Sequence, residues 1–227
     1  MFRAILFDID GTLINTRGAG VRAFTDTFDQ DFGIPNAAHN VSFAGRTDRA
    51  IVAEIFAAHR IARSTARFQQ FYAGYLPRLD QELLKRRGQI CPGVRALLRQ
   101  LQKHAPPPVI GLLTGNIPSG AERKLRRFDL WNEFEMGAFG ERFSERDQIA
   151  AHAFRTLRRK LGRTLRPEHV LIIGDTPRDI QCARAIGAKV LAVATGDFTT
   201  AQLRNHKPDL VVRTLRQVTV KRLFEVQ

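Results

Sequence analysis

The 227-residue sequence contains few cysteines, and none of its apolar stretches approaches the ~20 residues needed to cross a bilayer. Its two cysteines, Cys91 and Cys182, lie far apart and outside any CxxC pattern, which argues against a disulfide framework and a cysteine-based zinc site. The first segment, MFRAILFDID, lacks the basic start, long apolar core and small-residue cleavage site of a secretory signal. We therefore expect a soluble, cytoplasmic protein that does not enter a membrane.

Acidic residues are also scarce. There are 22 Asp and Glu against 36 Lys and Arg, and the formal net charge is +14. A nucleic-acid-binding protein concentrates basic residues on one face and places aromatic residues among them. Here the basic residues, mostly Arg, are spread over nearly every expected helix, so nucleic acid is not the expected partner. A positive field of this kind would instead attract phosphate-bearing anions.

Short apolar segments alternate with amphipathic segments along most of the chain, as in a parallel sheet covered by helices. The expected strands are 2–7, 109–113, 170–173, 190–193 and 210–212. Apolar spacing predicts helices over 94–101 and 149–161, and Pro118, after Asn116 as a cap, begins another that ends near residue 127. The pattern indicates an α/β fold with a Rossmann-like parallel sheet.

One long region, residues 15–87, contains helical periodicity and no convincing strand. Val21, Phe24 and Phe28 share one face of an expected helix, and aromatic residues at 68, 71, 72 and 75 share another. We interpret these stripes as the core of a helix bundle. The predicted organisation is a catalytic core formed by residues 1–14 and 88–227, with an inserted all-helical domain over 15–87.

Carboxylates follow two of the expected strands. FDIDGTL (7–13) places Asp8 and Asp10 at the end of the first strand. LIIGDTPRDI (171–180) places Asp175 at the end of another strand and Asp179 in the first turn of the helix that follows. Open parallel sheets bind ligands at the carboxyl ends of their strands. Acidic groups crowded at such an edge are unfavourable unless a cation or a proton relieves their repulsion. The pattern therefore predicts a site at this edge that binds a cation or holds a proton.

A third strand, VIGLLTGN, ends in Thr114, Gly115 and Asn116. A hydroxyl and backbone N–H groups at a strand end suit the oxygens of a phosphate group. The three segments, in this order and across almost the whole chain, resemble the haloacid-dehalogenase superfamily. The helical insert resembles the small C1-type cap of its phosphoglycolate-phosphatase-like members.

This resemblance implies a role for each matching residue. Asp8 would attack phosphorus and become an aspartyl-phosphate, and Asp10 would protonate the leaving alkoxide and then activate water. Mg²⁺ would be held by Asp8, the Asp10 backbone carbonyl and Asp175, with Asp179 supporting the site. Thr114, Gly115 and Asn116 would bind the phosphoryl group. The expected activity is Mg²⁺-dependent hydrolysis of small phosphorylated metabolites by a monomer or dimer.

The family also uses a Lys or Arg that contacts both the nucleophile and the phosphate. Its commonest form, Lys followed by Pro, is absent between Thr114 and Asp175. Lys124, in AERKL, resembles the position used by one subset of the family and is the favoured candidate. Arg146, in SERDQIA, is the alternative because it begins a helix near the usual position.

Within the insert, FAGRTDRAI (43–51) resembles a substrate-facing loop of phosphoglycolate-phosphatase-like members. Arg46 is therefore expected to clamp a substrate carboxylate or second phosphate. Asp10 argues against haloacid dehalogenation, since a halide leaves without a proton, and the position of Lys85 at the end of the insert argues against phosphonate cleavage by a Schiff base. A phosphosugar mutase remains an alternative, as does a basic nucleic-acid-binding or regulatory domain with idle catalytic residues.

Overall fold

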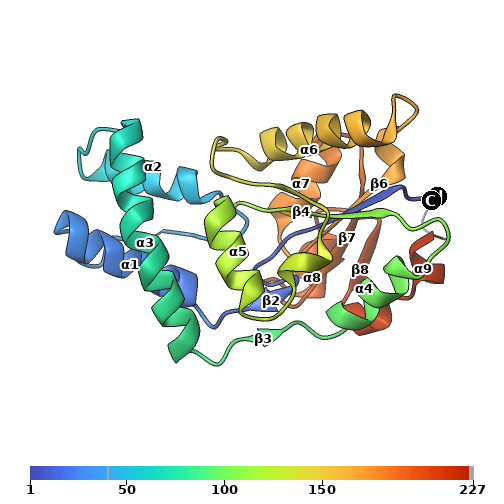
Figure 1. Cartoon of the computed structure of the whole chain (residues 1–227), viewed down its shortest axis with the longest axis horizontal. Coiled ribbons are helices and arrows are strands. Elements are labelled where there is room, and N and C mark those ends of the chain that lie inside the picture. The colour runs from blue at the N-terminus through green and yellow to red at the C-terminus, as the bar shows by residue number, and fades with distance from the viewer. Residues whose placement is uncertain (40, 225–227) are drawn as a thin grey trace.

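A computed structural model describes residues 1–39 and 41–224 of the chain (Figure 1). At its centre lies a six-stranded sheet in the order β5-β4-β1-β6-β7-β8, and every neighbouring pair of strands is parallel. The strands are β1 (Ala4–Phe7), β4 (Val109–Leu113), β5 (Met136–Ala138), β6 (Val170–Gly174), β7 (Lys189–Val193) and β8 (Leu210–Val212). The predicted α/β fold with a parallel sheet is confirmed.

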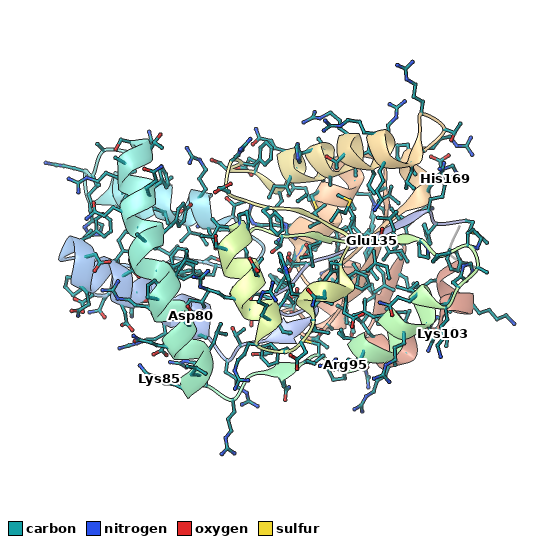
Figure 2. The ribbon with its side chains drawn as sticks, viewed as in Figure 1. Asp80, Lys85, Arg95, Lys103, Glu135 and His169 are labelled. Carbon is teal, nitrogen blue, oxygen red and sulfur yellow. The ribbon has the colours of Figure 1, made fainter. Side chains whose placement is uncertain are left out.

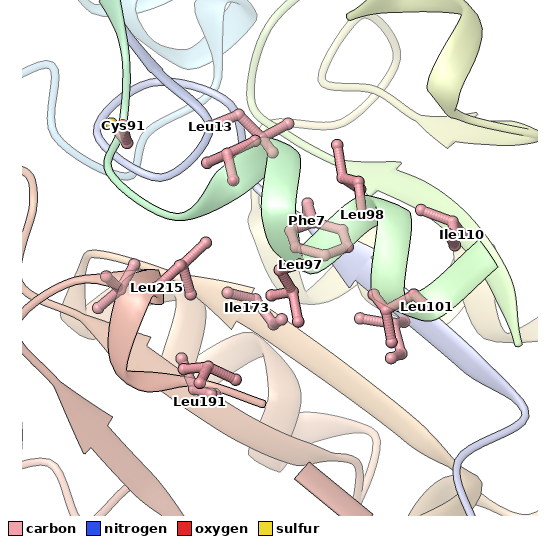
Figure 3. Close-up of a cluster of buried hydrophobic side chains, with 14 of the residues drawn as sticks. Phe7, Leu13, Cys91, Leu97, Leu98, Leu101, Ile110, Ile173, Leu191 and Leu215 are labelled. Carbon is pink, nitrogen blue, oxygen red and sulfur yellow. The ribbon is translucent and has the colours of Figure 1, made fainter. Parts of the chain in front are cut away.

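Helices cover both faces of this sheet, as Figure 1 shows for α4 and α6. Successive residues of a strand point to opposite faces, so Phe7 joins a cluster with Leu97 and Leu101 of α4, whereas Leu6 packs with Leu157 of α6. Figure 3 shows Phe7 and Leu97 within the first cluster. The helices around the sheet are α4 (Val94–Gln102), α5 (Pro118–Arg126), α6 (Arg146–Leu161), α7 (Pro177–Ala185), α8 (Thr200–Arg204) and α9 (Val220–Phe224).

Three further helices, α1 (Ala19–Phe32), α2 (Asp48–Ala58) and α3 (Thr65–Lys85), lie to one side of the sheet (Figure 1). They surround a hydrophobic cluster of their own, in which rings of α1 and α3 pack closely. Val21 was expected on this buried face, but it is 41% exposed because it borders the cavity described below. The division of the chain into a core and a cap stays a prediction.

Two short strands join the segments that lead into and out of these helices. β2 (Ile14–Asn15) pairs with β3 (Gln89–Ile90) in an antiparallel arrangement. Segments of two residues are too short to produce a periodic pattern, so neither strand was expected. The three-residue edge strand β5 was missed for the same reason.

Other differences from the expected elements are small. β1 begins at Ala4 rather than Phe2, β6 extends to Gly174, and β7 begins at Lys189. The N-cap of α5 is Ile117, and the Asn116 side chain has a different use in the site below. Among the described residues, no helix has the length and hydropathy of a membrane span. Figure 2 shows charged side chains both beside α3, with Asp80 and Lys85 labelled, and beside α4, with Arg95 and Lys103 labelled.

Candidate active site

Three strand ends meet at one cavity. β1 pairs with β4 on one side and with β6 on the other. Asp8, Thr114 and Asp175 each follow one of these strands, and all three line a cavity of about 340 Å³. The cavity lies at the carboxyl edge of the sheet, where open α/β folds bind their ligands. The expected meeting of these three side chains is therefore found.

Three buried carboxylates form the acidic part of this cavity. Ligand atoms of Asp8, Asp175 and Asp179 lie within 4.8 Å of one another. Burial raises the pKa of Asp8 to about 7, although the nearby Arg146 opposes that effect. Burial, followed by the neighbouring Asp8 carboxylate, raises the pKa of Asp175 well above its usual value. Burial and mutual repulsion therefore disfavour the charged forms of these carboxylates unless a cation offsets them.

The turn after β1 supports Asp175. The Thr12 hydroxyl donates a 2.9 Å hydrogen bond to Asp175 Oδ1. Gly11 adopts a φ of 83°, and a Cβ at this position would lie 2.3 Å from Asp175 Oδ2. The Gly-Thr sequence after the first two acids is thus required by the close approach of an acid from another strand.

Arg146 begins α6 and points into the acidic group. Its Nη2 donates to Asp8 Oδ1 at 3.1 Å, to the Leu113 carbonyl at 3.2 Å, and to Asp179 Oδ1. Burial alone would lower the pKa of this guanidinium, but the carboxylates of Asp179 and Asp8 outweigh burial and raise it. The structure therefore places Arg146, the alternative candidate, against the predicted nucleophile. Lys124, the favoured candidate, lies elsewhere in the cavity.

Lys124 contacts the second acid of the first motif. Its Nζ donates to Asp10 Oδ2 and to Asn116 Oδ1, both at 2.7 Å. Asn116 Nδ2 donates to Asp10 Oδ2 at 2.9 Å and to the Thr114 hydroxyl at 2.8 Å. These bonds use both N–H groups of the Asn116 amide and orient Asp10, and the contact of Asn116 with substrate stays a prediction. Two basic residues therefore line the cavity, and each pairs with different acids: Lys124 with Asp10, and Arg146 with Asp8 and Asp179.

Thr114 and Gly115 retain hydrogen-bond donors for a ligand. The Thr114 hydroxyl oxygen accepts from the side chain and the backbone N–H of Asn116, which leaves its proton available. Among the described residues, the Gly115 N–H has no backbone acceptor. A Cβ on Gly115 would lie 2.0 Å from the Arg46 carbonyl oxygen, so only glycine allows the loop at 45–48 to pack this closely.

Asp48 was not recognised as a site residue from the sequence. It begins α2, yet its Oδ2 accepts a 2.8 Å hydrogen bond from the Ile117 N–H, and its own N–H donates to the Gly115 carbonyl. Burial raises its pKa to about 6, although the nearby Lys124 opposes that effect. Its sequence context, an acid in the first turn of a helix, indicates only a local stabilising role. The contact with the loop after β4 arises from tertiary packing.

Arg46 has a different partner from the one expected. It lines the cavity, but its Nη2 forms an ion pair with Glu54 of α2, and its Nη1 donates to the Ser42 carbonyl. Since the guanidinium already has a carboxylate partner, this geometry does not support a free clamp for a substrate anion. The neighbouring Glu54 lies eight residues along the chain, a separation at which no periodic pattern predicts an ion pair.

Arg146→Met should lower the free energy of unfolding of the metal-free protein by about 3–5 kcal/mol, because it leaves Asp8 and Asp179 buried without their guanidinium partner. Urea unfolding in EDTA measures this loss. Arg155→Met, at an exposed position of the same helix, serves as the matched control and should change stability by less than about 1 kcal/mol. Equal losses in the two variants would contradict a charge-compensating role for Arg146.

Comparison with known proteins matches these features to one family. Residues 5–193 match the haloacid dehalogenase-like hydrolase family. The chain belongs to that family. Two relatives named phosphoglycolate phosphatase are similar along nearly their whole length. The one from Photorhabdus laumondii is 25% identical and aligns over 92% of this chain and 88% of its own, and the one from Synechococcus elongatus is 27% identical over 93% of each.

Solved structures agree on the fold of this hydrolase. CbbY from Rhodobacter sphaeroides, in complex with phosphate, has a TM-score of 0.72 at 19% identity and covers 95% of both chains. A haloacid dehalogenase-like hydrolase from Streptococcus pneumoniae has a TM-score of 0.67 at 24% identity and covers 98% of both. The family assignment and the expectation of a haloacid dehalogenase-like phosphatase are confirmed.

Proposed function

We propose that this hydrolase is a Mg²⁺-dependent phosphatase that cleaves small phosphomonoesters through an aspartyl-phosphate on Asp8. The observation that carries the proposal is the meeting of Asp8 with two further buried acids and the donors of Thr114 and Gly115 in one cavity. The names of the phosphoglycolate phosphatase relatives support a small phosphorylated substrate.

The reaction has two steps. An Asp8 carboxylate oxygen forms a bond to phosphorus as the ester P–O bond breaks, and Asp10 gives its proton to the leaving alkoxide. Water then attacks phosphorus, Asp10 takes a proton from it, and the bond to Asp8 breaks to release phosphate. Lys124 and Asn116 hold the Asp10 side chain for both proton transfers. Thr114 and Gly115 donate hydrogen bonds to the phosphoryl oxygens.

The acidic group fits Mg²⁺, the ion that the family generally uses. Its donors are carboxylate oxygens, which hard divalent cations prefer. Asp8 and Asp179 share Arg146, whereas within the described part of the chain Asp175 has no ion-pair partner. The three carboxylates thus outnumber the one guanidinium that pairs with them. Asp8, the Asp10 carbonyl and Asp175 would hold the ion, with Asp179 in support. When bound, Mg²⁺ would reduce the repulsion between an anionic nucleophile and an anionic phosphate.

We expect hydrolysis of p-nitrophenyl phosphate to stop in excess EDTA and to return on addition of Mg²⁺, because the repulsion among the three acids opposes phosphate binding without a cation. Mg²⁺ should also raise the melting temperature of the wild type, since binding to the folded state stabilises it. The rise should be lost in Asp175→Asn and kept in Asp197→Asn, which changes an exposed acid bordering the same cavity.

Full activity in EDTA would contradict the metal requirement, and a requirement for Zn²⁺ would do so too. Release of inorganic phosphate distinguishes hydrolysis from the mutase alternative, in which the phosphoryl group passes to another hydroxyl of a sugar. Binding of DNA at two salt concentrations tests the alternative of a basic nucleic-acid-binding domain. We also propose that the enzyme acts in the cytoplasm.

A further inference from the structure

Several of the residues that line the cavity are apolar, and three of them are aromatic. Phe24 of α1, Phe43 of the following loop and Tyr75 of α3 line it, together with Val21. The Phe24 ring lies 5.4 Å from the Phe43 ring and 4.7 Å from the Tyr75 ring, in edge-to-face arrangements. Phe24 and Tyr75 are almost fully buried, whereas Phe43 is half-buried and Val21 is 41% exposed, so the last two offer most of the surface that a ligand can touch. We call these four residues the aromatic wall.

The basic residues at the cavity all have carboxylate partners. Lys124 is paired with Asp10, Arg146 with Asp8 and Asp179, and Arg46 with Glu54. Within the described residues, no other Lys or Arg lines this cavity, whereas the acids Asp48 and Asp197 do. A second anionic group on the substrate would therefore meet carboxylates without a free cation to offset them.

One polar group interrupts the aromatic wall. Tyr75 borders the cavity, and its hydroxyl is the polar group among these four side chains. A Cβ at Gly20 would lie 3.8 Å from this hydroxyl and 3.3 Å from Lys124 Nζ, so both groups lie close to Gly20. The wall can thus offer one hydrogen bond close to the groups that position Asp10.

We infer that the alcohol released by this enzyme is uncharged and carries an aromatic ring, which packs against the aromatic wall while the phosphate lies at Asp8. This inference rests on the proposed phosphatase function and names its substrate class. Pockets of this kind bind rings through apolar contact and edge-to-face packing. A carboxylate-bearing substrate such as 2-phosphoglycolate would lose these contacts and approach Asp48.

Three alkyl phosphates test the inference on the full chain with Mg²⁺. 2-Phenylethyl phosphate, ethyl phosphate and 2-phosphoglycolate share the reacting phosphate and differ in the group beyond it. We expect kcat/KM for 2-phenylethyl phosphate to exceed that for ethyl phosphate by at least about tenfold, the rough value of burying part of a ring. 2-Phosphoglycolate should be no better than ethyl phosphate. The reverse order, with 2-phosphoglycolate preferred, would overturn the inference.

Val21→Asp places a charge at the edge of the wall without disturbing a buried position, since Val21 is 41% exposed. It should reduce kcat/KM for 2-phenylethyl phosphate at least about fivefold more than for ethyl phosphate. Leu84→Asp is the matched control, because Leu84 is 73% exposed on α3 and does not line the cavity, and it should leave the ratio of the two substrates unchanged.

The outcomes distinguish a wrong substrate class from a wrong phosphatase function. Hydrolysis of ethyl phosphate with no preference for the aromatic ester, or an unchanged ratio in Val21→Asp, overturns the substrate class and leaves the phosphatase function in place. Failure to hydrolyse any of the three esters, with p-nitrophenyl phosphate also untouched, overturns the phosphatase function and the inference with it.

Discussion

Asp8→Asn should abolish hydrolysis of p-nitrophenyl phosphate, with kcat falling by at least about 10⁴-fold, because an amide cannot attack phosphorus. The substitution keeps the shape of the side chain, and an amide oxygen can still accept the hydrogen bond from Arg146 Nη2. The fold should therefore persist, and circular dichroism checks this. Asp197→Asn, at an exposed acid of the same cavity, is the control and should retain activity.

Rapid-quench labelling tests the same step directly. Wild-type enzyme mixed with radiolabelled substrate should carry acid-stable, base-labile phosphate on Asp8. The peptide containing Asp8 identifies the position by mass spectrometry. Phosphate on another residue, or turnover with no labelled protein at any time, would defeat the covalent scheme.

Asp10→Asn should slow the cycle without removing the nucleophile. Proton transfer by a positioned side chain typically contributes ~10²–10⁴-fold, so kcat should fall within that range. p-Nitrophenolate leaves readily without a proton, so the first step should suffer less than the hydrolysis of the intermediate. The variant should therefore accumulate aspartyl-phosphate, seen as a burst of p-nitrophenol followed by slow turnover.

The leaving group provides an internal control for Asp10. With an alkyl ester such as ethyl phosphate, both steps need the proton, so the burst should disappear. A burst of equal size with both esters would show that Asp10 does not protonate the leaving group. Loss of the burst with p-nitrophenyl phosphate would show that Asp10 acts before the intermediate forms.

Most of the fold could be predicted because each buried parallel strand corresponds to a short apolar segment of the sequence. β4 and β8 have the expected bounds, and β1, β6 and β7 differ by one or two residues. The strands that could not be predicted are too short to show a periodic pattern. β5 has three residues and includes Gly137, and β2 and β3 have two each, so their existence depends on neighbouring strands.

The meeting of Asp8, Thr114 and Asp175 could also be predicted, because each residue directly follows a strand and parallel strands end at one edge. The partners of the long side chains could not. The sequence left both Lys124 and Arg146 as candidates for the cation that contacts the nucleophile. Only the packing of α5 and α6 against the sheet assigns Lys124 to Asp10 and Arg146 to Asp8.

By itself, the sequence determined the parallel α/β fold, the family, and the position of the acids at the carboxyl edge of the sheet. These features depend on local order along the chain, namely apolar runs and the residues that end them. The tertiary structure alone decided that Arg46 pairs with Glu54, that Asp48 reaches the loop after β4, and that aromatic rings face the site. Long side chains have many rotamers and possible partners, and which contact forms depends on how helices distant in the sequence pack together.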